Sequence, residues 1–486
     1  MLTPQRYSSD ITELSVSAWF YRNRAIAGFD NPARSLYVSI RELVENSLDA
    51  CEDERVLPDV SVFLSRNGEN RENDLLSSGP ENFDLTVKDN GKGIRRRDIP
   101  ILIGKMLTGT KFTLRQSRGT FGLGGSLALL YGQVTTQEPI KIVTGRRYEE
   151  FGHRVVMRLD IETNQPIIIQ EEKISKSPEE MGTMVSFQLQ GDWIRSKRRI
   201  IDYFTQTAII VPHASLLLET PDDEVLKFDR LIEQLPVAPK EMKPHPSGID
   251  VEMLKKMIGV TRALNLKSFM KSSFQRVGVS TAEEFLQYSQ LECDRVPSSL
   301  QQHELVSMMN SLASYEKFLP PSPKSLSPAG TILLMAGVQR LSPDFAVFRQ
   351  RAPNVYEGHP FIVETGVAYG GGLRSGIEIY RFANRIPLLY DERSDVAYRV
   401  VKDLNLKHYG LKQDDPIAFV VHICSTKIPY KTVGKEYIAD VDIVRREIGL
   451  GFKDCLRELS EKVRRRDRVH KQRRRENKLW GYYRFL

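Results

Sequence analysis

PARSLYVSIRELVENSLDACEDE, residues Pro32 to Glu54, is the stretch that decides the fold class of this chain. Asn31 can cap a helix and Pro32 can occupy its first turn, so a helix is predicted to begin here. Apolar residues recur at helical spacing and define a buried stripe: Leu36, Ile40, Leu43, Val44 and Leu48. The opposite face carries three polar residues, spaced four and three apart: Glu42, Asn46 and Asp49. A solvated face is the simplest interpretation of these residues, and a binding site is the alternative.

A second feature is the segment VKDNGKGI, Val87 to Ile94. Apolar and polar residues alternate from Phe83 to Lys88, which predicts a strand that ends at Asp89. Taken alone, Asp-Asn-Gly after a strand is typical of an ordinary turn.

A third feature is the glycine-rich segment RGTFGLGGSLALLYGQ, Arg118 to Gln133. Its glycines let the backbone approach a ligand closely, and Ser126 then opens an apolar helix. A glycine-rich loop that leads into a helix N-terminus offers N–H groups and the positive end of a dipole to a phosphate. On its own, such a loop is also compatible with a flexible connection.

The order of these three features resembles the ATP-binding (Bergerat) fold of the GHKL family, which includes gyrase B, heat-shock protein 90, histidine kinases and MutL. Phrases along nearly the whole chain narrow the resemblance to the B subunits of type IIB topoisomerases (topoisomerase VI): GFDNPARSLYVSIRELVENSLDAC, KPHPSGIDVEMLKKM, HPFIVETGVAYGG, YRFANRIPLLYD and STKIPYKTVGKE. The resemblance implies a subunit that binds and hydrolyses ATP and dimerises on ATP binding into a clamp around a DNA duplex. It also implies a cleavage (A) subunit in an A2B2 heterotetramer, which cuts the other duplex so that supercoils are relaxed and DNA is decatenated.

The same resemblance implies roles for single residues, with ATP and Mg²⁺ as cofactors. Glu42 matches the general base, and Asn46 matches the single protein ligand of Mg²⁺. Asp89 matches the acceptor for the adenine amino group, Gly93 lets the base lie against the backbone, and Thr183 helps to hold adenine. The remaining expected nucleotide-binding residues are Asp49, Thr110, Lys111, Gly119, Thr120, Phe121, Gly122, Leu123, Gly124, Gly125 and Ser126.

Lys427, in Ser-Thr-Lys-Ile-Pro-Tyr, matches the switch lysine that reaches the γ-phosphate from another domain. Such a lysine can distinguish a triphosphate from a diphosphate, because its charge partner disappears on hydrolysis. Tyr430 belongs to the same motif and has no nucleophile context, so DNA cleavage is expected from a partner chain. GKMLTGTK, from Gly104 to Lys111, is not a P-loop, because its Thr and Lys stand in the wrong order.

Composition is compatible with this resemblance. The 486 residues can hold several domains, and 41% hydrophobic and 27% charged residues are ordinary for a globular protein. The net charge of +8 permits a polyanion partner. No apolar run is long enough to span a bilayer, and MLTPQRYSSDITELS lacks the apolar core of a secretion signal. Four scattered cysteines argue against zinc and disulfides, so an intracellular, nucleoid-associated (in a eukaryote, nuclear) location is expected.

The expected fold class is α/β (α+β), in four parts. Residues 1–29 form an N-terminal strap, and 30–226 form the GHKL ATPase domain, with helices against a mixed, mainly antiparallel sheet. Residues 227–320 resemble a helix–two-turns–helix domain. Residues 321–486 resemble a transducer domain (ribosomal S5-like) with a long C-terminal helix and a basic, aromatic tail. The Pro- and Ser-rich stretch FLPPSPKSLSP, 318–328, is interpreted as a linker.

Two basic segments are candidates for contact with DNA. Lys197, Arg198 and Arg199 are interpreted as a compact loop after Trp193, either simply solvated or bound to phosphates. The stretch RRRDRVHKQRRRENK is typical of a solvated helix end, and the following WGYYRFL suggests that the partner subunit or DNA docks there.

Three other functions are compatible with parts of this pattern. A MutL-like repair clamp shares the fold but leaves the helical insert unexplained. A histidine kinase needs a phosphoacceptor helix upstream, and only about thirty residues precede the first motif. A non-catalytic scaffold of a meiotic DNA-break complex would tolerate loss of the site residues, yet Glu42, Asn46, Asp89 and Lys427 are all present.

Overall fold

The computed structural model describes Ser15 and residues 18–19, 22–67, 80–105, 114–119, 124–431 and 435–483. The chain divides into two units. Unit one comprises the described residues of Met1–Phe112, Arg118–Leu235 and Lys431–Glu436, and unit two those of Thr113–Ser117, Pro236–Tyr430 and Tyr437–Leu486. Each unit thus includes a short segment from a distant part of the sequence. No helix among the described residues is long and apolar enough to cross a membrane.

Helix α2 (Pro32–Asp53) begins where the sequence predicts. The side chain of Asn31 accepts a hydrogen bond from the backbone N–H of Arg34 at 2.8 Å, and Pro32 occupies the first turn. All residues of the predicted stripe are buried. Of the predicted polar face, Glu42 is 8% exposed, Asp49 is half-buried and Asn46 is exposed. The face is therefore covered at Glu42 and open to solvent at Asn46.

An eight-stranded sheet supports α2, in the order β5-β4-β3-β6-β2-β1-β7-β8. Its strands are β1 (Asp59–Arg66), β2 (Glu81–Asp89), β3 (Ile140–Gly145), β4 (Phe151–Asp160), β5 (Gln165–Ser175), β6 (Gly182–Gly191), β7 (Ser215–Glu219) and β8 (Val225–Phe228). Among these described strands only β1 and β7 pair in parallel, so the predicted mixed, mainly antiparallel sheet is confirmed. Helix α2 packs against β1, β2 and β6 and lies beside α4 (Gly124–Thr136) and α5 (Trp193–Ile210).

The basic triplet after Trp193 is helical, so the predicted loop is wrong. The side chain of Asp192 accepts a hydrogen bond from the backbone N–H of Arg195 at 3.0 Å and caps α5. Lys197, Arg198 and Arg199 therefore lie in the first turns of α5. Short helix α3 (Ile99–Gly104) packs against β4 and β5 in the same unit.

The first part of unit two is helical from Val251 to Ser314, whereas the expected start of this part at residue 227 lies within β8 of unit one. It contains α6 (Val251–Val260), α7 (Leu266–Ser273), α8 (Val279–Tyr288) and α9 (Gln302–Ser314). These helices enclose a core of their own around Phe269, Phe274 and Phe285, all of them buried. A separate core explains why this segment can be inserted between two sheets.

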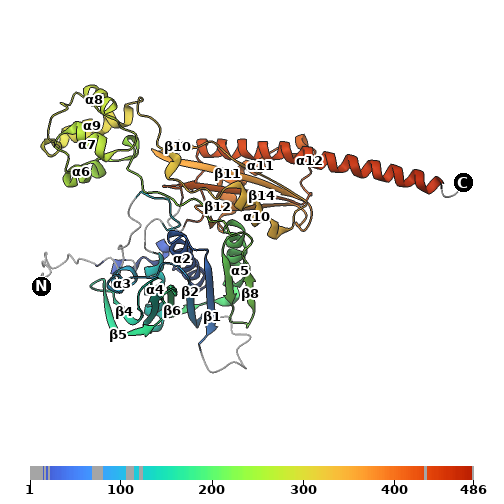
Figure 1. Cartoon of the computed structure of the whole chain (residues 1–486), viewed down its shortest axis with the longest axis horizontal. Coiled ribbons are helices and arrows are strands. Elements are labelled where there is room, and N and C mark those ends of the chain that lie inside the picture. The colour runs from blue at the N-terminus through green and yellow to red at the C-terminus, as the bar shows by residue number, and fades with distance from the viewer. Residues whose placement is uncertain are drawn as a thin grey trace. The chain divides into compact units, whose positions relative to one another are not determined.

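A second sheet, with β10-β11-β14-β12-β13 in order and β9 also paired with β11, forms the rest of unit two. Its strands are β9 (Phe345–Gln350), β10 (Asn354–Tyr356), β11 (His359–Tyr369), β12 (Ile377–Ala383), β13 (Ile386–Pro387) and β14 (Ile417–Ser425), with helices α10 (Thr331–Val338), α11 (Val396–Asp403) and α12 (Asp442–Tyr483). Helix α12 packs against β9 and β11 through buried residues that end at Val463, and Figure 1 shows it continuing well past the sheet. The predicted long C-terminal helix is confirmed.

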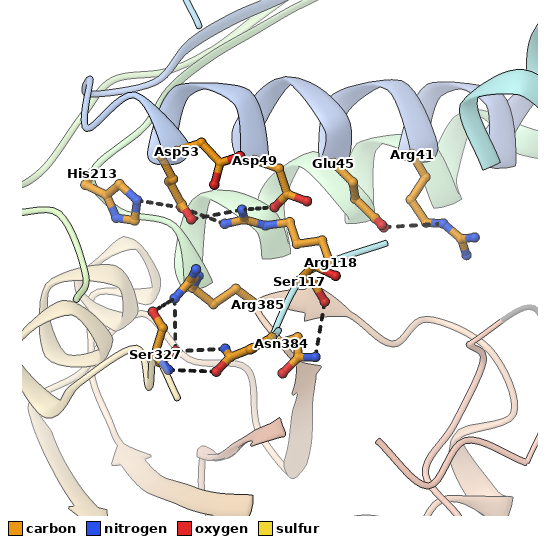
Figure 2. Close-up of polar contacts among 12 residues, drawn as sticks. Arg41, Glu45, Asp49, Asp53, Ser117, Arg118, His213, Ser327, Asn384 and Arg385 are labelled. Atoms are coloured by element: carbon orange, nitrogen blue, oxygen red, sulfur yellow. Dashed lines mark hydrogen bonds and ion pairs between the residues drawn. The ribbon is translucent and has the colours of Figure 1, made fainter. Parts of the chain in front are cut away.

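The proline-rich stretch 318–328 is packed and not a free linker. Ser327 is fully buried, and its backbone exchanges two hydrogen bonds with the side chain of Gln116, at 2.7 and 2.9 Å. The Arg385 guanidinium donates to the Ser327 hydroxyl at 2.8 Å, and Asn384 donates to the carbonyl of Ser117 at 3.2 Å (Figure 2). Gln116 and Ser117 are thereby held within unit two.

Candidate functional site

Glu42 is the buried carboxylate at the centre of the candidate site. The Arg41 guanidinium donates to Glu42 Oε1 at 2.6 Å, which fixes one oxygen of the carboxylate. The other oxygen faces the start of α4, because a Cβ placed on Gly124 would lie 1.8 Å from Glu42 Oε2. Only glycine fits there. The glycine-rich sequence therefore brings a helix N-terminus directly against the predicted general base.

Lys435 is the second charged group at this site, although the sequence did not single it out. The segment Lys431–Glu436 is part of unit one, and the Lys435 side chain is only 7% exposed. Its ammonium lies 3.6 Å from Glu45 Oε2 and 4.0 Å from Glu42 Oε1, and it donates to the carbonyl of Arg118 at 3.0 Å. Burial raises the pKa of the Glu45 carboxyl, and the charge of Lys435 opposes this shift.

Arg118 anchors the beginning of the glycine-rich segment to α2. Its guanidinium donates to Asp49 at 2.8 Å and makes two bonds with Glu52, at 2.7 and 3.0 Å. The side chain is 1% exposed, and Nε2 of His213 lies 3.1 Å from Glu52. Figure 2 shows Arg118 lying alongside α2, beside Asp49 and Glu45. Asp49, predicted as a nucleotide-binding residue, has Arg118 as a direct partner.

Asp89 lies on the buried face of β2, turned towards α2. Its carboxylate accepts hydrogen bonds from Ser47 Oγ at 2.9 Å and from the backbone N–H groups of Gly91 at 2.8 Å and Thr183 at 3.2 Å. Burial raises the pKa of Asp89 to about 6, and these donors oppose the shift. Strand register places Thr183 between Asp89 and Thr144, and the Thr183 and Thr144 hydroxyls are 3.1 Å apart. The sequence signal missed Thr144.

Two further glycines mark places where the backbone closely approaches other parts of the candidate site. Gly93 has a φ of +65°, and a Cβ there would lie 2.1 Å from the carbonyl oxygen of Gly145. Near the start of α4, a Cβ on Gly125 would lie 2.8 Å from the exposed amide of Asn46. Ser126, the next residue, is buried. The predicted residues of α2, β2, β6 and α4 are thus neighbours in unit one.

Not every predicted residue can be placed in this arrangement. Gly119 is described and lies next to Arg118, but six expected lid residues are outside the described residues: Thr110, Lys111, Thr120, Phe121, Gly122 and Leu123. Lys427 belongs to unit two, where its ammonium donates to Glu357 at 3.0 Å and its side chain is 60% exposed. Within unit one, Glu42 is therefore assembled with Lys435.

The residues of the basic triplet in α5 have different surroundings. Lys197 lies 2.9 Å from Asp222 and 3.1 Å from Glu224. The Arg198 side chain is 92% exposed, with Asp202 at 3.9 Å. Arg198 and Arg199 are both exposed, and the Arg198 charge is thus open to a polyanion.

Comparison with known proteins gives consistent matches. The sequence profile described as "Topoisomerase VI B subunit, transducer" matches residues 321–475. The chain is 39% identical over 453 residues to the B subunit of type 2 DNA topoisomerase 6 from Metallosphaera sedula, covering 92% of this chain and 84% of that protein. It is 37% identical over 462 residues to the protein of the same name from Sulfurisphaera tokodaii, covering 94% and 85%.

Among solved structures, the 43K ATPase domain of Thermus thermophilus gyrase B matches with a TM-score of 0.43 at 14% identity, covering 93% of this chain and 92% of that chain. This structural likeness is too weak to add to the sequence relatives.

Proposed function

The chain belongs to the family of topoisomerase VI B subunits, and from this premise we propose that it is the ATP-binding and ATP-hydrolysing subunit of a type IIB DNA topoisomerase. The observation that carries the proposal is the meeting of Glu42, Lys435 and the N-terminus of α4 inside unit one. ATP hydrolysis needs a group that orients water, donors for the phosphates and a cation near the γ-phosphate. These three features correspond to those needs.

The adenine end of the nucleotide is assigned to Asp89. A carboxylate already held by three donors keeps a fixed orientation, and it can accept a hydrogen bond from the exocyclic amino group. Thr183 borders the same position, and the tight turn at Gly93 lets a flat ring lie against the backbone. Burial of Asp89 excludes water, which strengthens the hydrogen bond.

At the phosphate end, Asn46 is the residue that would hold Mg²⁺. Its exposed amide lies one turn from Glu42 and beside the start of α4, and a single oxygen donor suits an ion that takes most ligands from phosphates and water. When bound, Mg²⁺ neutralises charge on the phosphate oxygens. The N–H groups at the start of α4 would face the phosphates with the positive end of the helix dipole.

Glu42 would orient the attacking water and accept its proton. Arg41 holds Oε1, so the carboxylate presents Oε2 towards the start of α4, where the phosphates are expected. Lys435 lies beside the same carboxylate, and we assign to it the γ-phosphate contact that the sequence resemblance gave to Lys427. The reason is the geometry within unit one, where Lys435 is a buried member of the Glu42 group.

The wider function follows from the family. ATP binding would close two copies into a clamp on one duplex, while an A subunit in an A2B2 assembly cuts another. Exposed Arg198 is a candidate phosphate contact for the captured DNA. We also propose the boundaries 1–29, 30–226, 227–320 and 321–486 for the strap, ATPase, helix–two-turns–helix and transducer parts, and an intracellular site of action.

The test is Mg²⁺-dependent ATP hydrolysis, with nucleotide affinity measured in parallel. Glu42→Gln should still bind an ATP analogue but lose about 10²-fold or more in kcat, because the base is gone. Lys435→Met should lose hydrolysis by a similar factor, whereas Lys427→Met should stay within roughly threefold of wild type.

Loss of hydrolysis in Lys427→Met and not in Lys435→Met would return the role to Lys427. A wild-type chain that neither binds nor hydrolyses ATP would favour the scaffold function.

A further inference from the structure

We propose that Glu45 is a positioning residue that holds Lys435 while the nucleotide site is empty, so that a γ-phosphate must compete with Glu45 for this lysine. The inference rests on the proposed function and deepens it. It concerns how the site distinguishes a triphosphate from a diphosphate. Glu45 lies one residue before the predicted Mg²⁺ ligand, and neither the sequence nor the resemblance gave it a role.

The geometry of the contact points to a holding site for the lysine. Of the two carboxylates beside the Lys435 ammonium, Glu45 is the nearer, at 3.6 Å against 4.0 Å for Glu42. The contact is enclosed, since the side chains of Lys435 and Glu45 are 7% and 3% exposed. A lysine without an opposite charge would be costly at this depth. Glu45 supplies that charge, which leaves Glu42 bonded to Arg41.

The ion pair between Glu45 and Lys435 also lacks a direct hydrogen bond, so another anion can replace Glu45 as the partner of Lys435. In the described part of the chain, neither oxygen of Glu45 accepts a hydrogen bond, although Arg41 Nε lies 3.5 Å from one oxygen and Lys435 lies 3.6 Å from the other. A buried ion pair without direct hydrogen bonds recovers only part of its desolvation cost. A phosphate oxygen that bonds the ammonium directly would therefore be a stronger partner.

Competition between Glu45 and the nucleotide for Lys435 concerns the γ-phosphate only. A γ-phosphate would bring an anion to Lys435, whereas a diphosphate would leave the lysine with Glu45. Glu45 thus lowers the affinity for a triphosphate without lowering the affinity for a diphosphate in the same measure. A purely structural Glu45, needed only to neutralise Arg41, would affect both nucleotides equally.

The experiment measures dissociation constants by titration calorimetry for the Mg²⁺ complexes of AMPPNP and ADP. Glu45→Gln keeps the shape of the side chain and removes its charge. We expect it to tighten AMPPNP binding about fivefold and to change ADP binding less than about twofold. Adding Lys435→Met should abolish this effect, so that Glu45→Gln no longer changes AMPPNP affinity in that background. Asp53→Asn is the matched control, an exposed carboxylate of α2 that pairs with Lys92.

Equal shifts for AMPPNP and ADP, or a shift that persists beside Lys435→Met, would overturn the inference. If Glu45→Gln does not fold, Glu45→Asp serves instead. It keeps a charge on α2 but withdraws it by one methylene, and should change the AMPPNP-to-ADP ratio in the same direction. Wild type that binds no nucleotide would overturn the proposed function as well. Wild type that binds and hydrolyses ATP without the selective shift in the variants would overturn the role of Glu45 alone.

Discussion

Asp89 and Glu45 are both buried carboxylates, yet their surroundings suit different tasks. Asp89 accepts three hydrogen bonds and is fixed in direction, which suits recognition of a ligand donor. Glu45 approaches two cations without accepting a hydrogen bond among the described residues, which suits an exchangeable contact. Asp89 and Glu45 thus differ in their hydrogen-bond partners, although both side chains are buried.

The pKa of Asp89 leads to a prediction about pH. Because its pKa is raised to about 6, the carboxyl of the free protein is protonated below that pH and ionised above it. An adenine amino group donates to the ionised form, so nucleotide affinity should rise as the pH increases through 6 and level off above it. Between pH 7.5 and pH 5 we expect roughly tenfold weaker binding of an ATP analogue, measured by calorimetry.

Asp89→Asn is the control for this titration. It cannot change charge, while the phosphates of the ligand titrate equally in both proteins. A pH profile of the same shape in wild type and Asp89→Asn would contradict the assignment of Asp89.

At the scale of single residues, the sequence predicts candidate site residues that stand in short motifs. It misses site residues that are brought together by contacts between distant parts of the chain. Glu42, Asn46 and Asp89 stand in short motifs whose spacing carries the signal. Lys435 approaches Glu45 from 390 positions away, and nothing in the local sequence distinguishes it from Lys427 as the lysine of that motif. Arg118 was part of a quoted motif, but its partners on α2 could not be inferred from spacing.

At the scale of elements, capping chemistry decided which predictions succeeded. The cap at Asn31 and the alternation before Asp89 correctly predicted α2 and β2. Asp192 is the same kind of capping residue before the basic triplet, and the charge of the triplet carries no information on whether it lies in a loop or a helix. The stretch 318–328 has linker composition, but buried Gln116 and Arg385 hold it in place, which composition cannot reveal.

Helix α12 gives a prediction about stability. Phe452 is fully buried and packs edge-on against Phe419 with ring centroids 5.0 Å apart. Phe452→Ala should therefore lower the free energy of unfolding of unit two by about 3–5 kcal/mol. A chain truncated after Asp467 keeps all the α12 residues that belong to the described core, and the Arg466–Asp344 ion pair, and should change that free energy by less than about 1 kcal/mol.

Chemical denaturation that follows the unfolding of unit two, in both its helical part and its sheet, would measure the free-energy change caused by Phe452→Ala and that caused by the truncation. A truncation that destabilises unit two as much as Phe452→Ala would show that the part of α12 beyond Asp467 supports the fold after all.

At the scale of the whole molecule, each unit is built from segments that are not contiguous in the sequence. Thr113–Ser117 is part of unit two although the chain before and after it is in unit one, and Lys431–Glu436 is part of unit one although its flanks are in unit two. The resemblance predicted the order of the parts along the chain. It could not predict these two exchanged segments, because their partners are set by contacts such as Gln116 with Ser327 and Lys435 with Arg118.

The central claim is that ATP binding at the Glu42 site closes two copies into a clamp. Analytical ultracentrifugation with and without AMPPNP and Mg²⁺ tests it most directly, on wild type, Asn46→Ala and Glu42→Gln. We expect the analogue to convert wild type and Glu42→Gln from monomer to dimer, and Asn46→Ala to remain a monomer, because it lacks the Mg²⁺ ligand. Sedimentation of wild type that is unchanged by nucleotide, under conditions in which calorimetry shows the analogue to be bound, would contradict the claim.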